Sequence, residues 1–534
     1  MRKKYLYMYV CFFMLGFLLA VPYHLFAQNV GIGTTTPNAS AALDVQSTNK
    51  GLLPPRMTTI QRDAISSPTP GLIIFNTDTQ SLEVFTNTGW FGIKKTNYAI
   101  EKLLGGFFDD GYPFGTQLGS PAIQKTTDGG YIVASVSRSS ANGDVTGTNH
   151  GFGDYWIVKL DAGGKITWNK LLGGDGDDTP ISIQQTTDGG YIVAGYSYSS
   201  ANGDVTGTNH GSEDYWVVKL DALGNIIWNK LLGGNQTDVA TGIQQTTDGG
   251  YIVAGYSGSS ANGDVTGTNH GSGDYWIVKL DALGNTVWNK LLGGTDEERA
   301  YSIQQTSDGG YIVAGYSNSS ASGNVTGTNH GPSLTGDYWI VKLGAVGNII
   351  WNKLLGGNGT EAPNSIQQTI DGAYIVAGAS NSSANGDVTG VNHGGNDYWI
   401  VKLDASGTIL WNKLLGGNNN DLAKSIQQTT DNGYIVAGYS GSSANGDVTG
   451  TNHGGLYDYW IVKLDAAGNI SWNKLFGGNL NDVANSIQQQ NNNGNYIIAG
   501  YSNSSANGDV TGQNHGQYDY WIVKIDAFGN IIRQ

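Results

Sequence analysis

The stretch from Ser182 to Gly234 decides the fold, and it reads SIQQTTDGGYIVAGYSYSSANGDVTGTNHGSEDYWVVKLDALGNIIWNKLLGG. Its β-forming residues fall into four short runs, and none of them has the periodicity of a helix. Asp-Gly-Gly and Asp-Ala-Leu-Gly are turn signals, and a long loop rich in Ser, Asn and Gly separates the second run from the third. The pattern predicts a four-stranded meander with strands at 182–186, 191–197, 215–220 and 225–232.

The same unit is written seven times, so the repeat dictates the architecture. The last three strands of the unit are apolar on both faces, which predicts that neighbouring units cover both faces. We therefore expect an all-β fold, a closed seven-bladed β-propeller of four-stranded blades over residues 98–534. An open β-solenoid is the alternative, although its coils are usually shorter than these units. The second strands of the seven copies start at Tyr131, Tyr191, Tyr251, Tyr311, Tyr374, Tyr434 and Tyr496.

Two segments resemble the fourth strand of the unit and are candidates for closing the ring. One is 98–104, and the other is the chain end, 530–534. Both lack the Trp of the other copies, with Ile100 and Arg533 in its place. We expect the first segment to close the ring, because it alone keeps the full Lys-Leu-Leu-Gly-Gly ending.

Composition excludes several classes of protein. The chain of 534 residues holds 81 Gly, 14 Trp and 29 Tyr, and only 13% of its residues are charged. A disordered acidic tail lacks such aromatic residues, and a coiled coil needs far more charge. The formal net charge of −15 disfavours nucleic acid and anionic membrane surfaces as partners.

Residues 1–27 have the pattern of an export signal. A basic start, Arg2 to Lys4, precedes an apolar stretch, and Ala27 is a small residue at the expected cleavage position. A single membrane anchor is the alternative, since the apolar run is nearly long enough to span a bilayer. Cleavage would remove Cys11, the only cysteine. We therefore expect a secreted protein, extracellular or on the outer cell surface, that is not an integral membrane protein.

The repeats resemble known propeller families. Leu220 to Trp228 is similar to the strand-turn-strand signature of quinoprotein-type propellers, in which a Trp wedges against the next blade. The run Gly-Gly-Tyr-Ile-Val-Ala-Gly resembles kelch blades, and the whole unit is similar to repeat arrays of secreted bacterial surface proteins. These likenesses imply a fold and carry no catalytic residues.

Residues 28–97 do not repeat and form a separate module. The series Gly51-Leu-Leu-Pro-Pro-Arg-Met57, Gln61-Arg-Asp-Ala-Ile65 and Gly71-Leu-Ile-Ile-Phe-Asn-Thr-Asp78 resembles the N-terminal module of bacterial cell-surface and tail-fibre-like proteins. That resemblance implies attachment to a surface or oligomerisation, and a plain β-rich spacer is the alternative. The local pattern predicts a short helix over 58–65 and a hairpin over 72–87.

The long loop between the second and third strands is the candidate ligand-binding site, because binding residues usually lie on loops held by a rigid scaffold. Seven of the eight His fall in these loops, and six loops carry an Asp; the fourth has Asn324 instead. The segments that join one blade to the next should emerge on the same face and add a ring of acids, Asp110, Asp178, Asp238, Glu298, Glu361, Asp421 and Asp482. The loop candidates are Asp144, His150, Asp204, His210, Asp264, His270, Asp387, His393, Asp447, His453, Asp509 and His515.

Calcium is a candidate ligand of these loops. Asn202, Asp204 and Thr206 alternate as they do in the first half of a calcium loop, with Gly207 at the sixth position. Only one carboxylate is present per loop, and His210 is a poor ligand for a hard cation. The alternative is that the Asp and Asn side chains cap turn amides and that the His bonds within its own loop. No other cofactor is expected.

The repetition also bears on function. An active site is usually one asymmetric constellation, whereas every acid, base and nucleophile here recurs in near-identical copies. We therefore expect a binding or adhesion scaffold for glycan or protein ligands, in which several weak sites gain affinity by avidity. An exported propeller enzyme acting on polysaccharide and a purely structural surface component are the alternatives.

Overall fold

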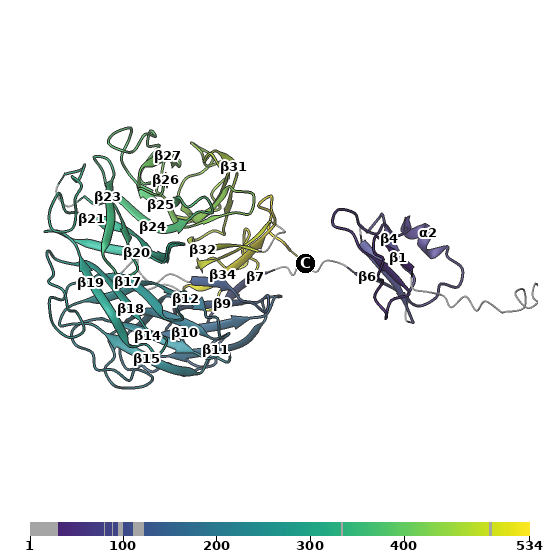
Figure 1. Cartoon of the computed structure of the whole chain (residues 1–534), viewed down its shortest axis with the longest axis horizontal. Coiled ribbons are helices and arrows are strands. Elements are labelled where there is room, and N and C mark those ends of the chain that lie inside the picture. Colours follow the sequence, from purple (N-terminus) through teal and green to yellow (C-terminus); the bar gives the residue numbers. More distant parts are fainter. Residues whose placement is uncertain are drawn as a thin grey trace, which may run out of the picture. The chain divides into compact units, whose positions relative to one another are not determined.

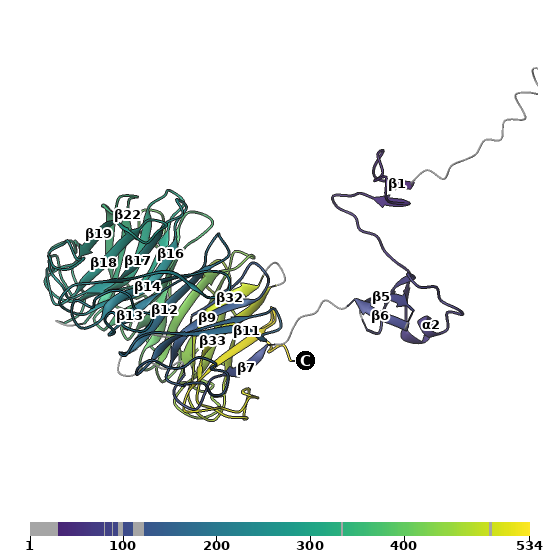
Figure 2. The same cartoon turned by 90° about the horizontal axis from the view of Figure 1, so that it is seen from below.

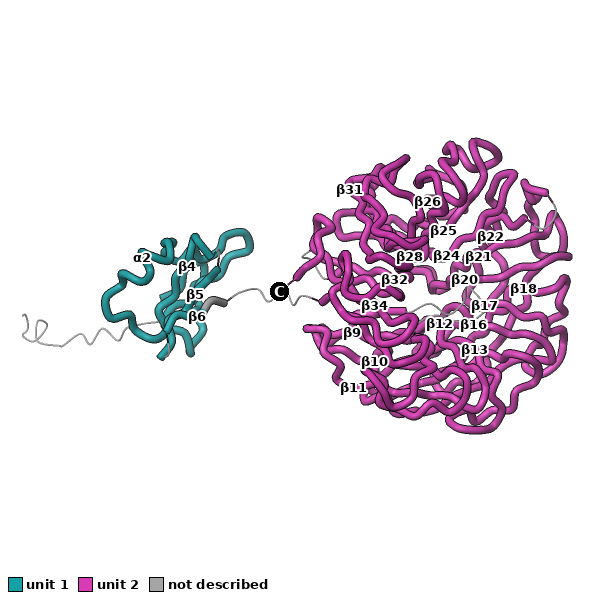
Figure 3. Tube along the Cα trace, turned by 180° about the vertical axis from the view of Figure 1, so that it is seen from behind, with its two compact units in different colours: residues 1–96 teal, residues 97–534 magenta. Residues whose placement is uncertain are grey.

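The computed structural model describes residues 30–79, 81–87, 89–93, 100–110, 122–332, 335–490 and 494–533. The chain divides into two compact units, residues 1–96 and residues 97–534 (Figure 3). The predicted export signal lies outside the described residues.

The described residues of the first unit form short strands and a helical turn. The helix α2 (Thr59–Asp63) starts at Thr58, whose hydroxyl accepts from the Gln61 backbone N–H while the Gln61 side chain accepts from Thr58 N–H. The predicted helix and hairpin are both present. The strands are β1 (Val30–Ile32) and β2 (Leu43–Val45), which pair in parallel, and a four-stranded sheet of β3 (Arg56–Met57), β4 (Ile73–Asn76), β5 (Ser81–Thr86) and β6 (Gly89–Ile93).

The second unit is a propeller of seven four-stranded antiparallel sheets, as predicted (Figures 1 and 2). The first strand of each blade is innermost and the fourth is outermost. Blades one to three are β8 (Ala122–Lys125), β9 (Tyr131–Ser137), β10 (Asp154–Leu160), β11 (Ile166–Leu172); β12 (Asp178–Gln185), β13 (Tyr191–Ser197), β14 (Asp214–Leu220), β15 (Ile226–Leu232); and β16 (Asp238–Gln245), β17 (Tyr251–Ser257), β18 (Asp274–Leu280), β19 (Thr286–Leu292). Blades four to six are β20 (Glu298–Gln305), β21 (Tyr311–Ser317), β22 (Asp337–Leu343), β23 (Ile349–Leu355); β24 (Glu361–Gln368), β25 (Tyr374–Ser380), β26 (Asp397–Leu403), β27 (Ile409–Leu415); and β28 (Asp421–Gln428), β29 (Tyr434–Ser440), β30 (Asp458–Leu464), β31 (Ile470–Phe476).

The seventh blade joins the two ends of the propeller. It consists of β32 (Asp482–Gln490), β33 (Asn495–Ser502), β34 (Asp519–Ile525) and β7 (Glu101–Leu104). β7 pairs antiparallel with β34, so the N-terminal segment closes the ring, as expected. The Trp521 indole N–H donates to Glu101 Oε1 at 2.8 Å, which replaces the bond that Trp216 makes to Asn229 in a regular blade.

The second and third strands of a blade are its most buried part. Every residue of β13 and β14 is buried, as the two-sided apolar pattern predicts. The prediction is wrong for the fourth strand, where Ile227 of β15 is 56% exposed and only Leu231 and Leu232 are buried. The fourth strand has a sheet neighbour on one edge only and lies at the perimeter, so part of its surface faces solvent.

Aromatic residues hold adjacent blades together. The rings of Tyr155 and Trp216 lie 4.5 Å apart across the first blade junction, and the Tyr155 hydroxyl donates to the Trp216 carbonyl at 3.0 Å. The outer Trp168 covers Gly224 in the turn of the next blade, where φ is +78° and a Cβ would come within 2.8 Å of the indole. The Trp156–Tyr520 contact repeats this packing between the first and last blades.

Candidate functional site

The long loops are bonded to the segment that joins two blades, here called the crossover. In the second blade, Asp204 N–H donates to Gly173 O at 2.8 Å, and Gly173 N–H donates to Asp204 Oδ2 at 3.2 Å. Asp175 N–H donates to Asn202 Oδ1 at 2.7 Å, and the Thr206 hydroxyl donates to Asn229 Oδ1 at 3.0 Å. The side chains predicted to hold a metal therefore anchor the loop.

The fourth loop shows that this anchoring needs an acceptor and not a charge. Asn324 Oδ1 accepts from Gly293 N–H at 3.2 Å, as Asp204 does in the second blade. Ser322 Oγ accepts from Thr295 N–H at 3.0 Å in place of Asn202. Among the described residues no group of three His, Cys, Asp or Glu is arranged to hold a metal. The side-chain oxygens of Asn202, Asp204 and Thr206 are thus engaged in hydrogen bonds that anchor the loop.

Each loop histidine makes hydrogen bonds to the Asp that begins the third strand. His210 Nδ1 lies 3.0 Å from Asp214 Oδ2, and the same oxygen accepts from His210 N–H. The bond joins the loop to the first residue of the third strand in the same blade, in line with the alternative of a local bond, and it recurs in all seven blades.

The far edge of the imidazole faces the next blade. His330 Nε2 lies 3.8 Å from Asp387 Oδ2, and His453 Nε2 lies 3.7 Å from Asp509 Oδ2. The structure therefore brings the histidine of one loop toward the aspartate of the following loop at these two junctions. At these two junctions the loop candidates contact each other across the blade boundary.

The crossover acids were expected on the surface, and that prediction is wrong. Asp178 is fully buried, and its Oδ2 accepts from Gly174 N–H at 2.7 Å and from the Ser199 hydroxyl at 3.0 Å. The acid is the first residue of the innermost strand, so the long loop covers it. All seven are buried: Asp110, Asp178, Asp238, Glu298, Glu361, Asp421 and Asp482.

Each crossover acid lies near a second buried carboxyl group, at the start of a third strand. A Cβ on Gly173 would come 2.5 Å from Asp154 Oδ1 and 2.7 Å from Asp178 Oδ2, so glycine is required between them. Burial raises the pKa of Asp178 to about 6, and the charge of Asp154 adds to the shift. The pairs are Asp519 with Asp110, Asp154 with Asp178, Asp214 with Asp238, Asp274 with Glu298, Asp337 with Glu361, Asp397 with Asp421, and Asp458 with Asp482.

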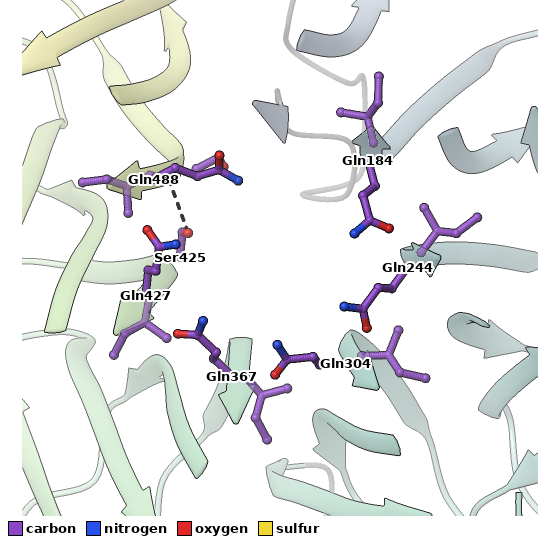
Figure 4. Close-up of a pocket in the computed structure, with 14 residues that line it drawn as sticks. Gln184, Gln244, Gln304, Gln367, Ser425, Gln427 and Gln488 are labelled. Carbon is purple, nitrogen blue, oxygen red and sulfur yellow. Dashed lines mark hydrogen bonds between the residues drawn. The ribbon is translucent and has the colours of Figure 1, made fainter. Parts of the chain in front are cut away.

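A cavity of about 250 Å³ lies on the propeller axis, and sequence reasoning missed it (Figure 4). Its wall is made by the Ile-Gln pairs of the first strands in six blades, together with Ser425 and Ser486. These residues belong to the end of the first strand, opposite the long loops. The repeated Ile-Gln-Gln of the first strands was the sequence signal for this cavity. Assigning the segment to a strand does not show whether its glutamines face a cavity or bulk solvent.

The first glutamine of each Ile-Gln-Gln run accepts a hydrogen bond from the next blade. Gln245 N–H donates to Gln184 Oε1 at 2.5 Å, and Gln305 N–H donates to Gln244 Oε1 at 2.6 Å. The same bond joins the other blades around the ring, including the closure, where Lys125 N–H donates to Gln488 Oε1 at 2.9 Å.

These features define the class of protein: a seven-bladed β-propeller scaffold with a separate N-terminal β-rich unit. Residues 31–102 match a family described as phage tail like trimerisation region, in agreement with the resemblance to tail-fibre-like proteins. Among the described residues, none of the helices has the length and apolar character needed to cross a bilayer.

Full-length relatives are distant. Regulatory protein FlaEY of Caulobacter vibrioides is 26% identical over 280 residues, which cover 51% of this chain and 28% of that protein. The chain thus matches little more than a quarter of the length of this curated relative.

Solved structures that resemble the chain share little sequence with it. Hydrazine synthase of Kuenenia stuttgartiensis has a TM-score of 0.45 at 12% identity, covering 78% of this chain and 99% of that one. The Pan2 WD40 domain of Neurospora crassa has a TM-score of 0.40 at 12% identity, covering 77% of this chain and 92% of that one. BamB of Moraxella catarrhalis has a TM-score of 0.36 at 13% identity, covering 80% of this chain and 94% of that one.

Proposed function

We propose that the protein is an exported, oligomeric binding scaffold whose seven long loops present near-identical contact residues to a glycan or protein ligand. The observation that carries this proposal is the repetition of an exposed polar pattern on one face. Thr206, Thr208 and His210 of the second blade are exposed, while Val205 and the anchoring Asp214 beside them are buried.

The loops are rigid enough to act as binding elements. Their tips are bonded to the crossover and to the third strand, so little conformational entropy is lost when a ligand binds. Thr208 and the far edge of His210 offer a hydroxyl and a ring nitrogen, which suit the hydroxyl groups of sugars and the polar groups of proteins. Each contact is small, so affinity would come from several loops acting together.

The N-terminal unit supports oligomeric display. Residues 31–102 match the trimerisation family, and three copies would multiply the number of loops available to a polyvalent ligand. Export is supported by the sequence of residues 1–27. The repeated loops single out no unique acid, base or nucleophile, which favours binding over catalysis.

Isothermal titration of the full chain against a panel of glycans tests the proposal. We expect several equivalent sites per chain and no turnover of the ligand. Changing Thr208 and its equivalents Thr148, Thr268, Thr328 and Thr451 to Ala should weaken binding about tenfold through lost avidity.

The control is Thr187→Ala with the same change at Thr127, Thr247 and Thr430, because Thr187 is exposed in a turn at the opposite end of the strands. A single site per chain, hydrolysis of the glycan, or equal loss in both sets of variants would contradict the proposal.

A further inference from the structure

We propose that the ring of glutamine amides on the propeller axis binds an oxyanion, that is, the phosphate, sulfate or carboxylate group of a small molecule. The site is independent of the long loops, because it lies at the other end of the first strands. It goes beyond the binding function proposed above.

The hydrogen bonds of the ring fix the direction of each amide. Gln304 Oε1 accepts from Gln368 N–H at 2.6 Å, and Gln367 Oε1 accepts from Gln428 N–H at 2.7 Å. Exchanging the oxygen and nitrogen would set an NH₂ group against a backbone N–H, so the amide cannot flip without losing this bond.

The amide nitrogens are therefore left for the cavity. Figure 4 shows the labelled glutamine side chains converging on the middle of the ring, with their nitrogen atoms on the inner side. The cavity wall consists of Ile, Gln and Ser residues and carries no carboxylate. Ser425 Oγ is itself occupied, because it accepts from Ile487 N–H. A ring of N–H donors without a facing acceptor is complementary to a group with several acceptor oxygens.

Negative charge near the ring is compensated. In six blades the turn after the first strand carries an Asp, and a lysine of the third strand pairs with it; Lys219 Nζ lies 2.9 Å from Asp188 Oδ2. Six blades show this ion pair. These Lys–Asp pairs carry no net charge, so they do not repel an anion at the axis, although the net charge of the chain is negative.

One innermost strand carries a lysine near the ring in sequence. Lys424 stands at the irregular position of β28 between Ala423 and Ser425, three residues before Gln427. At the equivalent position, Asn364 Nδ2 donates to Ala423 O at 2.7 Å, which places side chains of this position between the first strands of adjacent blades.

The other blades have no charge at this position. Ile181, Thr241, Tyr301, Asn364 and Asn485 take the place of Lys424 there. Burial lowers the pKa of Lys424 to about 8, and the sixth blade alone brings an amine to this position of the innermost strand.

Titration calorimetry on the full chain, with inorganic phosphate, sulfate, glucuronate and glucose as separate probes, tests the site. We expect saturable binding of at least one oxyanion at one site per chain, and none of glucose. Tighter binding of phosphate or sulfate would assign a phosphorylated or sulfated ligand, whereas tighter binding of glucuronate would assign a carboxylate.

Two matched variants locate the site. Gln304→Glu keeps an oxygen for Gln368 N–H but places a carboxylate in the ring, and we expect oxyanion affinity to fall at least about tenfold. Gln305→Glu adds the same charge one residue along, where the side chain accepts from Thr247 N–H outside the cavity wall, and should leave affinity nearly unchanged.

Thermal unfolding of both variants without ligand checks that they fold, and the bound oxyanion should raise the Tm of the wild type and of Gln305→Glu only. No saturable oxyanion binding by the wild type, glucose binding of equal strength, or equal loss of affinity in the two variants would overturn the proposal.

Discussion

Asp204 shows how a residue that looks like a ligand serves the fold. Its carboxylate accepts a backbone N–H from the crossover, and Asn324 performs the same task in the fourth blade. The role of the residue is therefore set by its acceptor oxygen, and the negative charge is dispensable.

Substitution of Asp204 tests this role. We expect Asp204→Asn to change the Tm little, whereas Asp204→Ala should cost about 1 kcal/mol, because Gly173 N–H loses its partner. Thermal unfolding with added calcium and with chelator measures both the effect of the substitutions and the proposed absence of a metal. If calcium raises the Tm of the wild type and Asp204→Asn abolishes the rise, the anchoring interpretation fails.

At the scale of the element, the starts of the first and third strands bring two acids together at every blade junction. Asp482 begins β32 and lies near Asp458 at the start of β30, with His453 bonded to Asp458 and facing Asp509. Burial raises the pKa of Asp482 to about 7, and the charge of Asp458 contributes to the shift.

The raised pKa predicts how stability depends on pH. An unfolded Asp ionises near pH 4, so the folded state binds more protons between about pH 4 and pH 7. The contribution of Asp482 is complete below this range and is lost as the pH rises through it. The Tm of the wild type should therefore fall between pH 5 and pH 8.

Asp482→Asn should flatten this decline and raise stability at pH 8 by about 1 kcal/mol, since the amide carries no charge. Asp296→Asn is the control, because Asp296 is an exposed residue of a crossover on the same face. Tm values measured from pH 5 to pH 8 decide the matter. The explanation is wrong if Asp482→Asn keeps the full decline or if the control flattens it equally.

At the scale of the whole molecule, two features set the assembly: closure of the ring by β7 and the apolar surface of the first unit. Leu52, Leu53 and Ile60 of that unit are 74%, 70% and 82% exposed. We propose that these exposed apolar side chains contact other copies, since residues 31–102 match the trimerisation family.

Light scattering of the full chain should give the mass of three copies. We expect Leu52→Ser with Leu53→Ser to shift the mass toward one copy, because burial of both side chains is worth about 2 to 4 kcal/mol per protomer. Leu223→Ser is the control, since Leu223 is 67% exposed in a propeller turn. A monomeric wild type, or a trimer unaffected by the double substitution, would contradict the assignment.

Much of this protein could be predicted from its sequence. The four strands of a blade, their order and the number of blades follow from a unit that recurs about every 60 residues. Closure by 98–104 also follows, because Lys102, Leu103 and Leu104 repeat the ending of the fourth strand. These features depend on contacts within one unit or between a unit and the next copy of itself, so local patterns suffice to predict them.

Only the tertiary structure decided where the polar residues point. Asp178 and Asp204 are both acids near a loop, yet the first is sealed under the loop and the second caps it. Gln184, Gln244 and Gln304 form one wall although they are about 60 residues apart in the chain. Their convergence exists because ring closure brings the innermost strands of different blades around a common axis. The sequence of one blade cannot predict this axis, because the axis exists only when all seven blades are assembled.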